Sequence, residues 1–313
     1  MLTYVIRRLG LALVVLLGLC IATFFMIHLV PGDPVRAALA GRASPDAIAR
    51  ARHQLGLDRP VLSQFWLYLS HTVQGNFGTS FAYNSSVGSI VGQRIGASAA
   101  LIVYGMVLSL LIGVPLAIVA ALRPNGWLDN AIRAGTTLTF AMPAFWLGLM
   151  LALIFGLSLK WFPVSGYSSG IGGILRTLTL PALALGLALS TVVVRTLRSS
   201  LLEVLQSEYI EAARSRGMTE LRVVGKHAMR NSFMSTLTLL AVNIGFLIGG
   251  TVVLEQVFQI PGVGSLLLDA VKQRDYATIQ ALALLAGAAV VLASLVADLT
   301  QAALDPRIRL AGR

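Results

Sequence analysis

The sequence predicts an all-α, polytopic membrane protein with six transmembrane helices. Hydrophobic residues make up 56% of the 313 residues and charged residues only 12%, whereas soluble globular proteins carry about 25% charged residues. A span needs about 20 apolar residues, and each span must be helical because lipid offers the backbone no hydrogen-bond partner. The apolar segments of this length cover about 9–30, 98–121, 133–157, 177–195, 234–256 and 279–303.

The first span begins directly after Arg7 and Arg8 and runs without a charge over residues 9–30. A cleaved signal peptide has a shorter apolar core, of about 7–15 residues, and a small-residue cleavage site. Here "PGDP" at 31–34 follows the apolar run instead. We therefore expect residues 1–30 to form an N-terminal segment with a retained first transmembrane helix.

A long extracytoplasmic loop, residues 31–97, follows this span. Ser44-Pro45-Asp46 is typical of a helix start, so we expect a short helix over 47–55. An amphipathic helix rich in aromatic residues is expected over 61–73; it would lie at the membrane interface or pack on the bundle. Residues 75–80 are expected to form a loop.

Three prolines fall within or at the edges of the later spans: Pro115, Pro143 and Pro181. An interior proline removes a backbone donor from the helix, which membrane helices tolerate when neighbouring groups satisfy the freed carbonyl. We expect kinks at these three positions.

The distribution of positive charge predicts the orientation. Six spans place both termini on one side, and 14 of the 24 Lys and Arg lie on that side, in residues 1–8, 122–133, 195–231 and 304–313. Positive residues favour the cytoplasm, so both termini are expected there. This distribution also explains the net charge of +11 without nucleic-acid binding.

The sequence carries no signature of an enzyme. The histidines lack metal-ligand spacing, Cys20 is the single cysteine, and neither H-E-x-x-H nor G-x-x-x-x-G-K-[ST] occurs. We therefore expect no catalytic residue, no metal site and no cofactor in this chain. If ATP is used, another chain binds it together with magnesium.

Polar residues within spans are candidates for function because they are costly in lipid. Glu255 and Asp298 lie near span ends, where pairing with arginine or helix capping is the favoured interpretation. Asn243 lies in the middle of the fifth span. It makes an interhelical hydrogen bond or lines a cavity.

The connection between the fourth and fifth spans is far longer than the 2–8 residues or so that a helix–helix connection needs. Apolar residues recur at helical spacing over 199–216, with Glu211 and Arg214 spaced to pair. Gly217 is expected to end this helix, and Thr219 to cap a second segment that has Arg222 at its third position. Such defined structure favours a docking surface for a cytosolic partner; the alternative is an amphipathic helix on anionic lipid.

A set of motifs, in order along nearly the whole chain, resembles the dipeptide/oligopeptide/nickel permease family of ABC transporters. The resemblance is to the first-type permease subunit, like dipeptide permease B, and it includes the EAA loop at Glu211-Ala212-Ala213. One departure is Ser235, where family members commonly carry proline. The motifs are "IRRLG", "PGDP", "LGLDRP", "GNFGTS", "RSSLLEVL", "EYIEAARSRGM", "HAMRNS", "PGVG", "RDY" and "DPRIR".

The resemblance implies a type I ABC importer permease fold and a place in a bacterial cell membrane. With a second permease subunit the chain would form a translocation path for di- or oligopeptides, although family members also carry nickel chelates, glutathione or haem. Two ATPase subunits and an extracytoplasmic solute-binding protein would complete the complex. A membrane scaffold that does not transport is the alternative function.

The resemblance also implies roles for particular residues. The EAA loop would dock on an ATPase subunit and couple it to the spans, and the 122–132 loop would make a second, smaller contact. The solute path would run between the permeases. The coupling residues are Tyr209, Glu211, Ala212, Ala213, Gly217 and Arg222; the second contact is Trp127 and Asp129; the path residues are Asn243 and Pro143.

The expected division of the chain follows these assignments. The parts are 1–30 with the first span, 31–97 as extracytoplasmic loop, 98–303 as a five-helix core that includes the coupling loop at about 198–233, and 304–313 as cytoplasmic tail.

Overall fold

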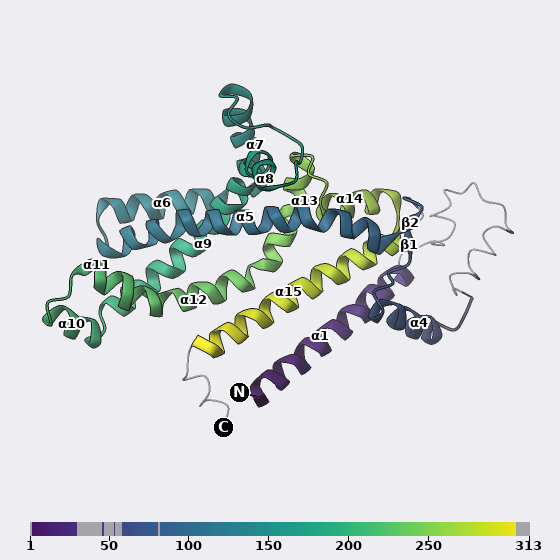
Figure 1. The fold of residues 1–313 in the computed structure, drawn as a ribbon, viewed down its shortest axis with the longest axis horizontal. Coiled ribbons are helices and arrows are strands. Elements are labelled where there is room, and N and C mark those ends of the chain that lie inside the picture. Colours follow the sequence, from purple (N-terminus) through teal and green to yellow (C-terminus); the bar gives the residue numbers. More distant parts are fainter. Residues whose placement is uncertain (1, 30–45, 47–52, 54–57, 81, 305–313) are drawn as a thin grey trace. The chain divides into compact units, whose positions relative to one another are not determined.

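The chain is almost entirely helical in a computed structural model that describes residues 2–29, 46, 53, 58–80 and 82–304 (Figure 1). In the described part, four single helices are long and apolar enough to cross a membrane. They are α1 (Leu2–Leu29), α5 (Val87–Leu122), α9 (Thr179–Leu205) and α15 (Tyr276–Leu304). The helix expected over 47–55, except for residue 53, and the tail after 304 lie outside the described residues.

The remaining two predicted spans are bent pairs of helices. α6 (Trp127–Ala141) meets α7 (Ala144–Leu151), which continues as the π-helical turn η1 (Ala152–Ser158), at an angle of 102°. A helical run from α11 to α12 (Met229–Val242) meets α13 (Ile244–Val257) at 55°. The segments predicted over 133–157 and 234–256 are therefore each divided into two helices at a bend, and the structure has six spans when each bent pair counts as one.

The three prolines behave differently. Pro143 lies in the break between α6 and α7, so the kink predicted there is confirmed. α5 continues through Pro115 as one helix. Pro181 lies in the first turn of α9, where a backbone N–H has no partner within the helix. Proline at this position therefore removes no helical hydrogen bond and does not require a kink.

One compact unit combines residues 1–98 with 261–295. In it, α4 (Val61–Val73) packs on α1 through an edge-to-face contact of Phe24 with Phe65, whose ring centroids are 5.3 Å apart. The hydroxyls of Thr23 and Tyr68 are hydrogen-bonded at 3.0 Å. The structure thus places one face of the amphipathic helix against the first span.

A small hairpin in this unit is held by a buried carboxylate. β1 (Thr79–Ser80) pairs with β2 (Ser85–Ser86) antiparallel, so the end of the expected 75–80 loop is a short strand. The Ser80 hydroxyl donates to Asp275, which also accepts from the Thr278 hydroxyl at 2.7 Å. Asp275 follows α14 (Val263–Gln273) and therefore connects the hairpin to the start of α15.

The second unit includes residues 99–260 and is built on a close crossing of α5 and α9. A Cβ added at Gly186 would lie 2.9 Å from the carbonyl oxygen of Gly105. One added at Gly113 would lie 2.8 Å from a methyl group of Val193. Glycine is thus required for the backbones to approach this closely. The short helix α8 (Ile171–Thr177) leads into α9.

Candidate functional site

The candidate site is the polar loop, residues 206–228, which connects α9 to α12. It consists of α10 (Glu208–Ser215), α11 (Glu220–Arg222) and the π-helical turn η2 (Val223–Ala228) (Figure 1). The single helix expected over 199–216 is divided, because Ser207 adopts an extended backbone and begins α10 as its N-cap. The Ser207 hydroxyl donates to the carbonyl of Val204 in the last turn of α9, so this side chain satisfies the end of α9.

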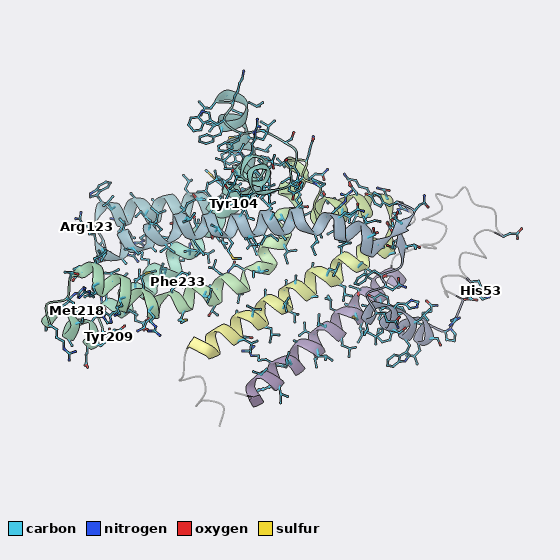
Figure 2. The ribbon with its side chains drawn as sticks, viewed as in Figure 1. His53, Tyr104, Arg123, Tyr209, Met218 and Phe233 are labelled. Carbon is cyan, nitrogen blue, oxygen red and sulfur yellow. The ribbon has the colours of Figure 1, made fainter. Side chains whose placement is uncertain are left out.

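Gly217 ends α10 as predicted. Its φ of +76° is left-handed, a conformation that glycine adopts without steric cost. The N–H of Gly217 donates to the carbonyl of Arg214 at 2.9 Å, and that of Met218 to the carbonyl of Ala213 at 3.3 Å. These two bonds form a Schellman motif, and the Met218 side chain then packs back onto the buried side of the loop (Figure 2).

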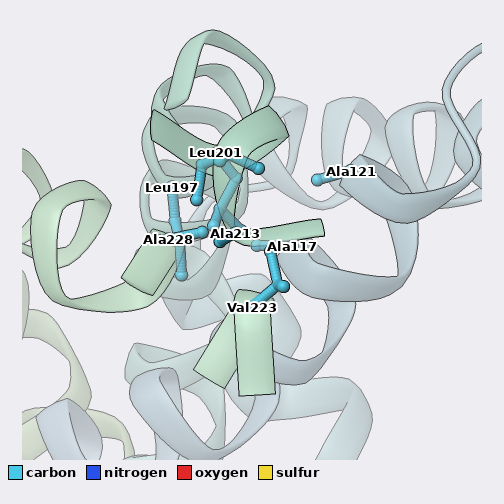
Figure 3. Packing of buried hydrophobic residues seen from close by; sticks show 8 residues of the cluster. Ala117, Ala121, Leu197, Leu201, Ala213, Val223 and Ala228 are labelled. Atoms are coloured by element: carbon cyan, nitrogen blue, oxygen red, sulfur yellow. The ribbon is translucent and has the colours of Figure 1, made fainter. Parts of the chain in front are cut away.

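The inner face of the polar loop packs against α5 and α9 in one hydrophobic cluster, called the loop core below (Figure 3). Fully burying a leucine, isoleucine or valine side chain contributes about 1.5–3 kcal/mol. The loop is therefore fixed to two membrane helices and is not a loose linker. The loop core consists of Ala117, Ala121, Leu197, Leu201, Ile210, Ala213, Val223 and Ala228.

The outer face of the polar loop is exposed and mainly polar. Arg214 and Glu220 pair across the Gly217 turn, with Nε to Oε1 at 2.7 Å and Nη2 to Oε2 at 3.3 Å. The hydrogen bonds that the Arg214 guanidinium donates to the Glu220 carboxylate raise the pKa of Arg214. The predicted Glu211–Arg214 pair was wrong, because the turn brings Glu220 to Arg214. Leu221, which follows Glu220 in α11, is also on the outer face and is 87% exposed.

Tyr209 connects the outer face to the start of α12. Its hydroxyl accepts a hydrogen bond of 2.8 Å from the side-chain amide of Asn231, and its ring is exposed (Figure 2). α10 is thus held to α9 through the loop core and to α12 through this bond.

The six predicted coupling residues divide between the two faces. Ala213 is buried in the loop core, because adjacent residues of a helix point about 100° apart. The others, Tyr209, Glu211, Ala212, Gly217 and Arg222, are exposed.

The second predicted contact divides in the same way. Trp127 is 77% exposed, whereas Asp129 has no exposed surface. Both oxygens of Asp129 accept from Arg198, Nε and Nη2 each at 2.6 Å, and Oδ2 also accepts from the N–H of Asn125 at 2.9 Å. The predicted direct contact of Asp129 with a partner was therefore wrong, because its carboxylate is buried in an ion pair within the chain. The predicted contact through Trp127 stays a prediction.

Sequence reasoning did not single out Arg198. One signal was present: no acidic residue lies three or four positions before or after it, so no helical neighbour could pair with it. The carboxylate that pairs with it lies on another helix.

Both predicted path residues lie at breaks within bent pairs. Asn243 separates α12 from α13, and its side-chain amide donates to the carbonyl of Leu239 at 2.8 Å. Pro143 occupies the corresponding place before α7. Of the carboxylates predicted to be structural, Glu255 is fully buried in α13 and Asp298 is half-buried in α15. Within the described residues, no group of three His, Cys, Asp or Glu could hold a metal ion.

Nearly the whole chain matches two models of one transporter family. Residues 113–310 match "Binding-protein-dependent transport system inner membrane component", and residues 1–102 match the N-terminal part of such components.

Proteins similar to this chain include transport permeases from several bacteria. The glutathione transport system permease protein GsiC of Salmonella choleraesuis is 40% identical over 312 residues, and GsiC of Escherichia coli K12 is 38% identical over 309 residues. A protein of Brucella suis biovar 1 that is named as a peptide permease is 38% identical over 320 residues. In each case the match covers 99% of both chains.

The fold is similar to that of a solved transporter. A chain of the MetNI methionine ABC transporter in an inward-facing conformation matches with a TM-score of 0.58 at 16% identity, over 69% of this chain and 96% of that chain. The type I importer fold expected from the sequence is thereby confirmed. The apolar helices, the family models and the full-length relatives agree: this multi-pass membrane protein belongs to the family of binding-protein-dependent transport system inner membrane components.

Proposed function

We propose that the polar loop is the place where a cytosolic ATPase subunit docks and drives transport through this permease. The observation that carries the proposal is the division of the loop into a packed inner face and an exposed outer face. The inner face fixes α10 and η2 to α5 and α9. A displacement applied to the outer face would therefore reach two membrane helices, whereas a flexible linker would absorb it.

The proposed complex contains a second permease subunit, two ATPase subunits and an extracytoplasmic solute-binding protein. ATP and magnesium would be held by the ATPase subunits, because this sequence has no phosphate-binding loop. Both termini and the polar loop would lie in the cytoplasm, in line with the excess of Lys and Arg on that side.

The proposed solute is a small peptide, and glutathione, itself a tripeptide, is the first candidate. The names of the relatives support this class, since they are named for glutathione and for peptides. The path would run between the two permeases past Asn243 and Pro143, where the two bent pairs change direction.

The test is uptake by the complete complex reconstituted in proteoliposomes. Labelled glutathione and a labelled dipeptide are supplied with the binding protein outside and ATP inside. We expect ATP-dependent accumulation of one of them, and its loss when the Glu211→Ala or Gly217→Pro permease replaces the wild type. Wild-type uptake and hydrolysis rates in both variants would exclude the coupling role of the loop.

A further inference from the structure

We propose that the buried ion pair of Asp129 and Arg198 is a positioning element for coupling. It would pass movement of the polar loop from α9 to α6, and so to the bent pair that contains Pro143. This proposal rests on the proposed function of the polar loop and adds two residues that act behind its surface.

The geometry is that of a rigid clamp. Two parallel hydrogen bonds of 2.6 Å join the guanidinium of Arg198 to the carboxylate of Asp129, which fixes both distance and orientation. The side chain of Arg198 is 18% exposed and that of Asp129 is 0% exposed. The N–H of Asn125, which has a left-handed φ of 62°, donates a further bond to the same carboxylate. Asp129 therefore joins the turn before α6 and Arg198 of α9 at a shielded point.

Arg198 lies on the part of α9 that also carries the polar loop. Leu197 and Leu201 flank it in the sequence, and both insert fully buried into the loop core. Successive residues point in different directions around a helix, so this short stretch reaches the loop core on one side and Asp129 on another. Any displacement of this end of α9 must therefore act on both attachments.

A second contact joins the same two helices farther along α6. The guanidinium of Arg195 lies over the ring of Phe140, 5.5 Å from its centroid. Phe140 is in the last turn of α6, directly before the break at Pro143. α6 is thus held to α9 near its beginning and near its end, so it would follow α9 as a rigid body and transfer the movement to the break.

The polar loop carries a second arginine–carboxylate pair on its surface, and comparison with it explains why the buried pair would transmit movement better. Arg214 and Glu220 are 40% and 59% exposed, and such surface pairs contribute little because water screens them. The buried pair is shielded, and removing one partner leaves an uncompensated charge in the interior.

The experiment compares coupling in variants of the complete complex in proteoliposomes. Arg198→Lys keeps the charge but loses the two-pronged geometry, and Asp129→Asn removes the counter-charge at nearly constant shape. The control, Glu203→Gln, removes a carboxylate at an exposed position of the same helix. Solute taken up and ATP hydrolysed are both measured per assembled complex, and the amount assembled is measured by size-exclusion chromatography.

We expect the control to keep the wild-type ratio of uptake to hydrolysis. In Arg198→Lys and Asp129→Asn that ratio should fall by about 5- to 150-fold, the range typical of coupling between two sites, while hydrolysis continues. Reversing the pair with Asp129→Arg and Arg198→Asp together should restore part of the ratio, because the proposal assigns the effect to the pairing and not to either residue alone.

Two different results would overturn the two proposals separately. If the wild-type complex couples and Arg198→Lys and Asp129→Asn couple equally well per assembled complex, the ion pair has no role in coupling. If the wild-type complex shows no ATP-driven uptake, the proposed function itself fails.

Discussion

The two adjacent alanines of the polar loop offer a matched test, because Ala213 lies in the loop core and Ala212 lies on the outer face. Ala213→Leu adds three carbon atoms to a packed cluster, and overpacking of this kind costs about 1–3 kcal/mol. If α10 opens locally to relieve the strain, its open population rises by about 5- to 150-fold, since each 1.4 kcal/mol is a factor of ten. Ala212→Leu adds the same atoms on the exposed outer face, so it should change the free energy of unfolding by no more than about 0.5 kcal/mol.

Amide hydrogen exchange of the purified protein in nanodiscs measures this opening directly. We expect the α10 amides around Ala213 to lose protection in Ala213→Leu and to keep it in Ala212→Leu. Binding of the ATPase subunits to the same samples should fall in both variants, but for different reasons: a displaced helix in the first and a blocked surface in the second. Equal protection in the two variants would refute the division of the loop into inner and outer faces.

Three further predictions follow from single positions. Gly217→Pro should release the ATPase subunits or uncouple hydrolysis from uptake, because proline cannot adopt the φ of +76°. Glu211→Ala should have the same effect at the outer face. Co-purification of the ATPase subunits, together with the rates of uptake and hydrolysis, checks both variants. Asn243→Leu should change the transport kinetics of a complex that still assembles, and unchanged kinetics would leave Asn243 as a packing residue. Gly186→Val should lower the yield of folded protein, because the added Cβ would lie 2.9 Å from the Gly105 carbonyl oxygen. The control Gly135→Val should be tolerated, because no atom lies within 4 Å of its added Cβ. Equal yields of the two variants on size-exclusion chromatography would contradict the close α5–α9 crossing.

The locations of the membrane segments could be predicted from hydropathy alone, because the cost of exposing polar groups to lipid dominates the choice of residues there. The break at Pro143 was also predictable, since proline removes a backbone donor. The break at Asn243 was not. No proline marks it. The Leu239 carbonyl accepts from both the backbone N–H and the side-chain amide of Asn243, a local contact that hydropathy does not register.

The candidate site was predictable in outline but not in its contacts. Gly217 and the polar stretch around it identified the loop, and helical spacing alone could have placed Ala212 and Ala213 on different faces. The pairing of Asp129 with Arg198 could not be read from the sequence, because it depends on how α6 and α9 pack. Likewise, Arg214 pairs with Glu220 rather than Glu211 only because the turn at Gly217 has a particular geometry.

The proposed contact between the outer face of the polar loop and an ATPase subunit can be measured by cysteine cross-linking. Cys20 is the single cysteine, so Cys20→Ser provides a background into which Ala212→Cys or Ala213→Cys is introduced. In the assembled complex, a short thiol-to-amine cross-linker should join the cysteine at 212 to an ATPase subunit and should leave the one at 213 unreacted. Absence of any cross-link from the cysteine at 212, in a complex that transports, would show that the outer face of the polar loop does not contact an ATPase subunit.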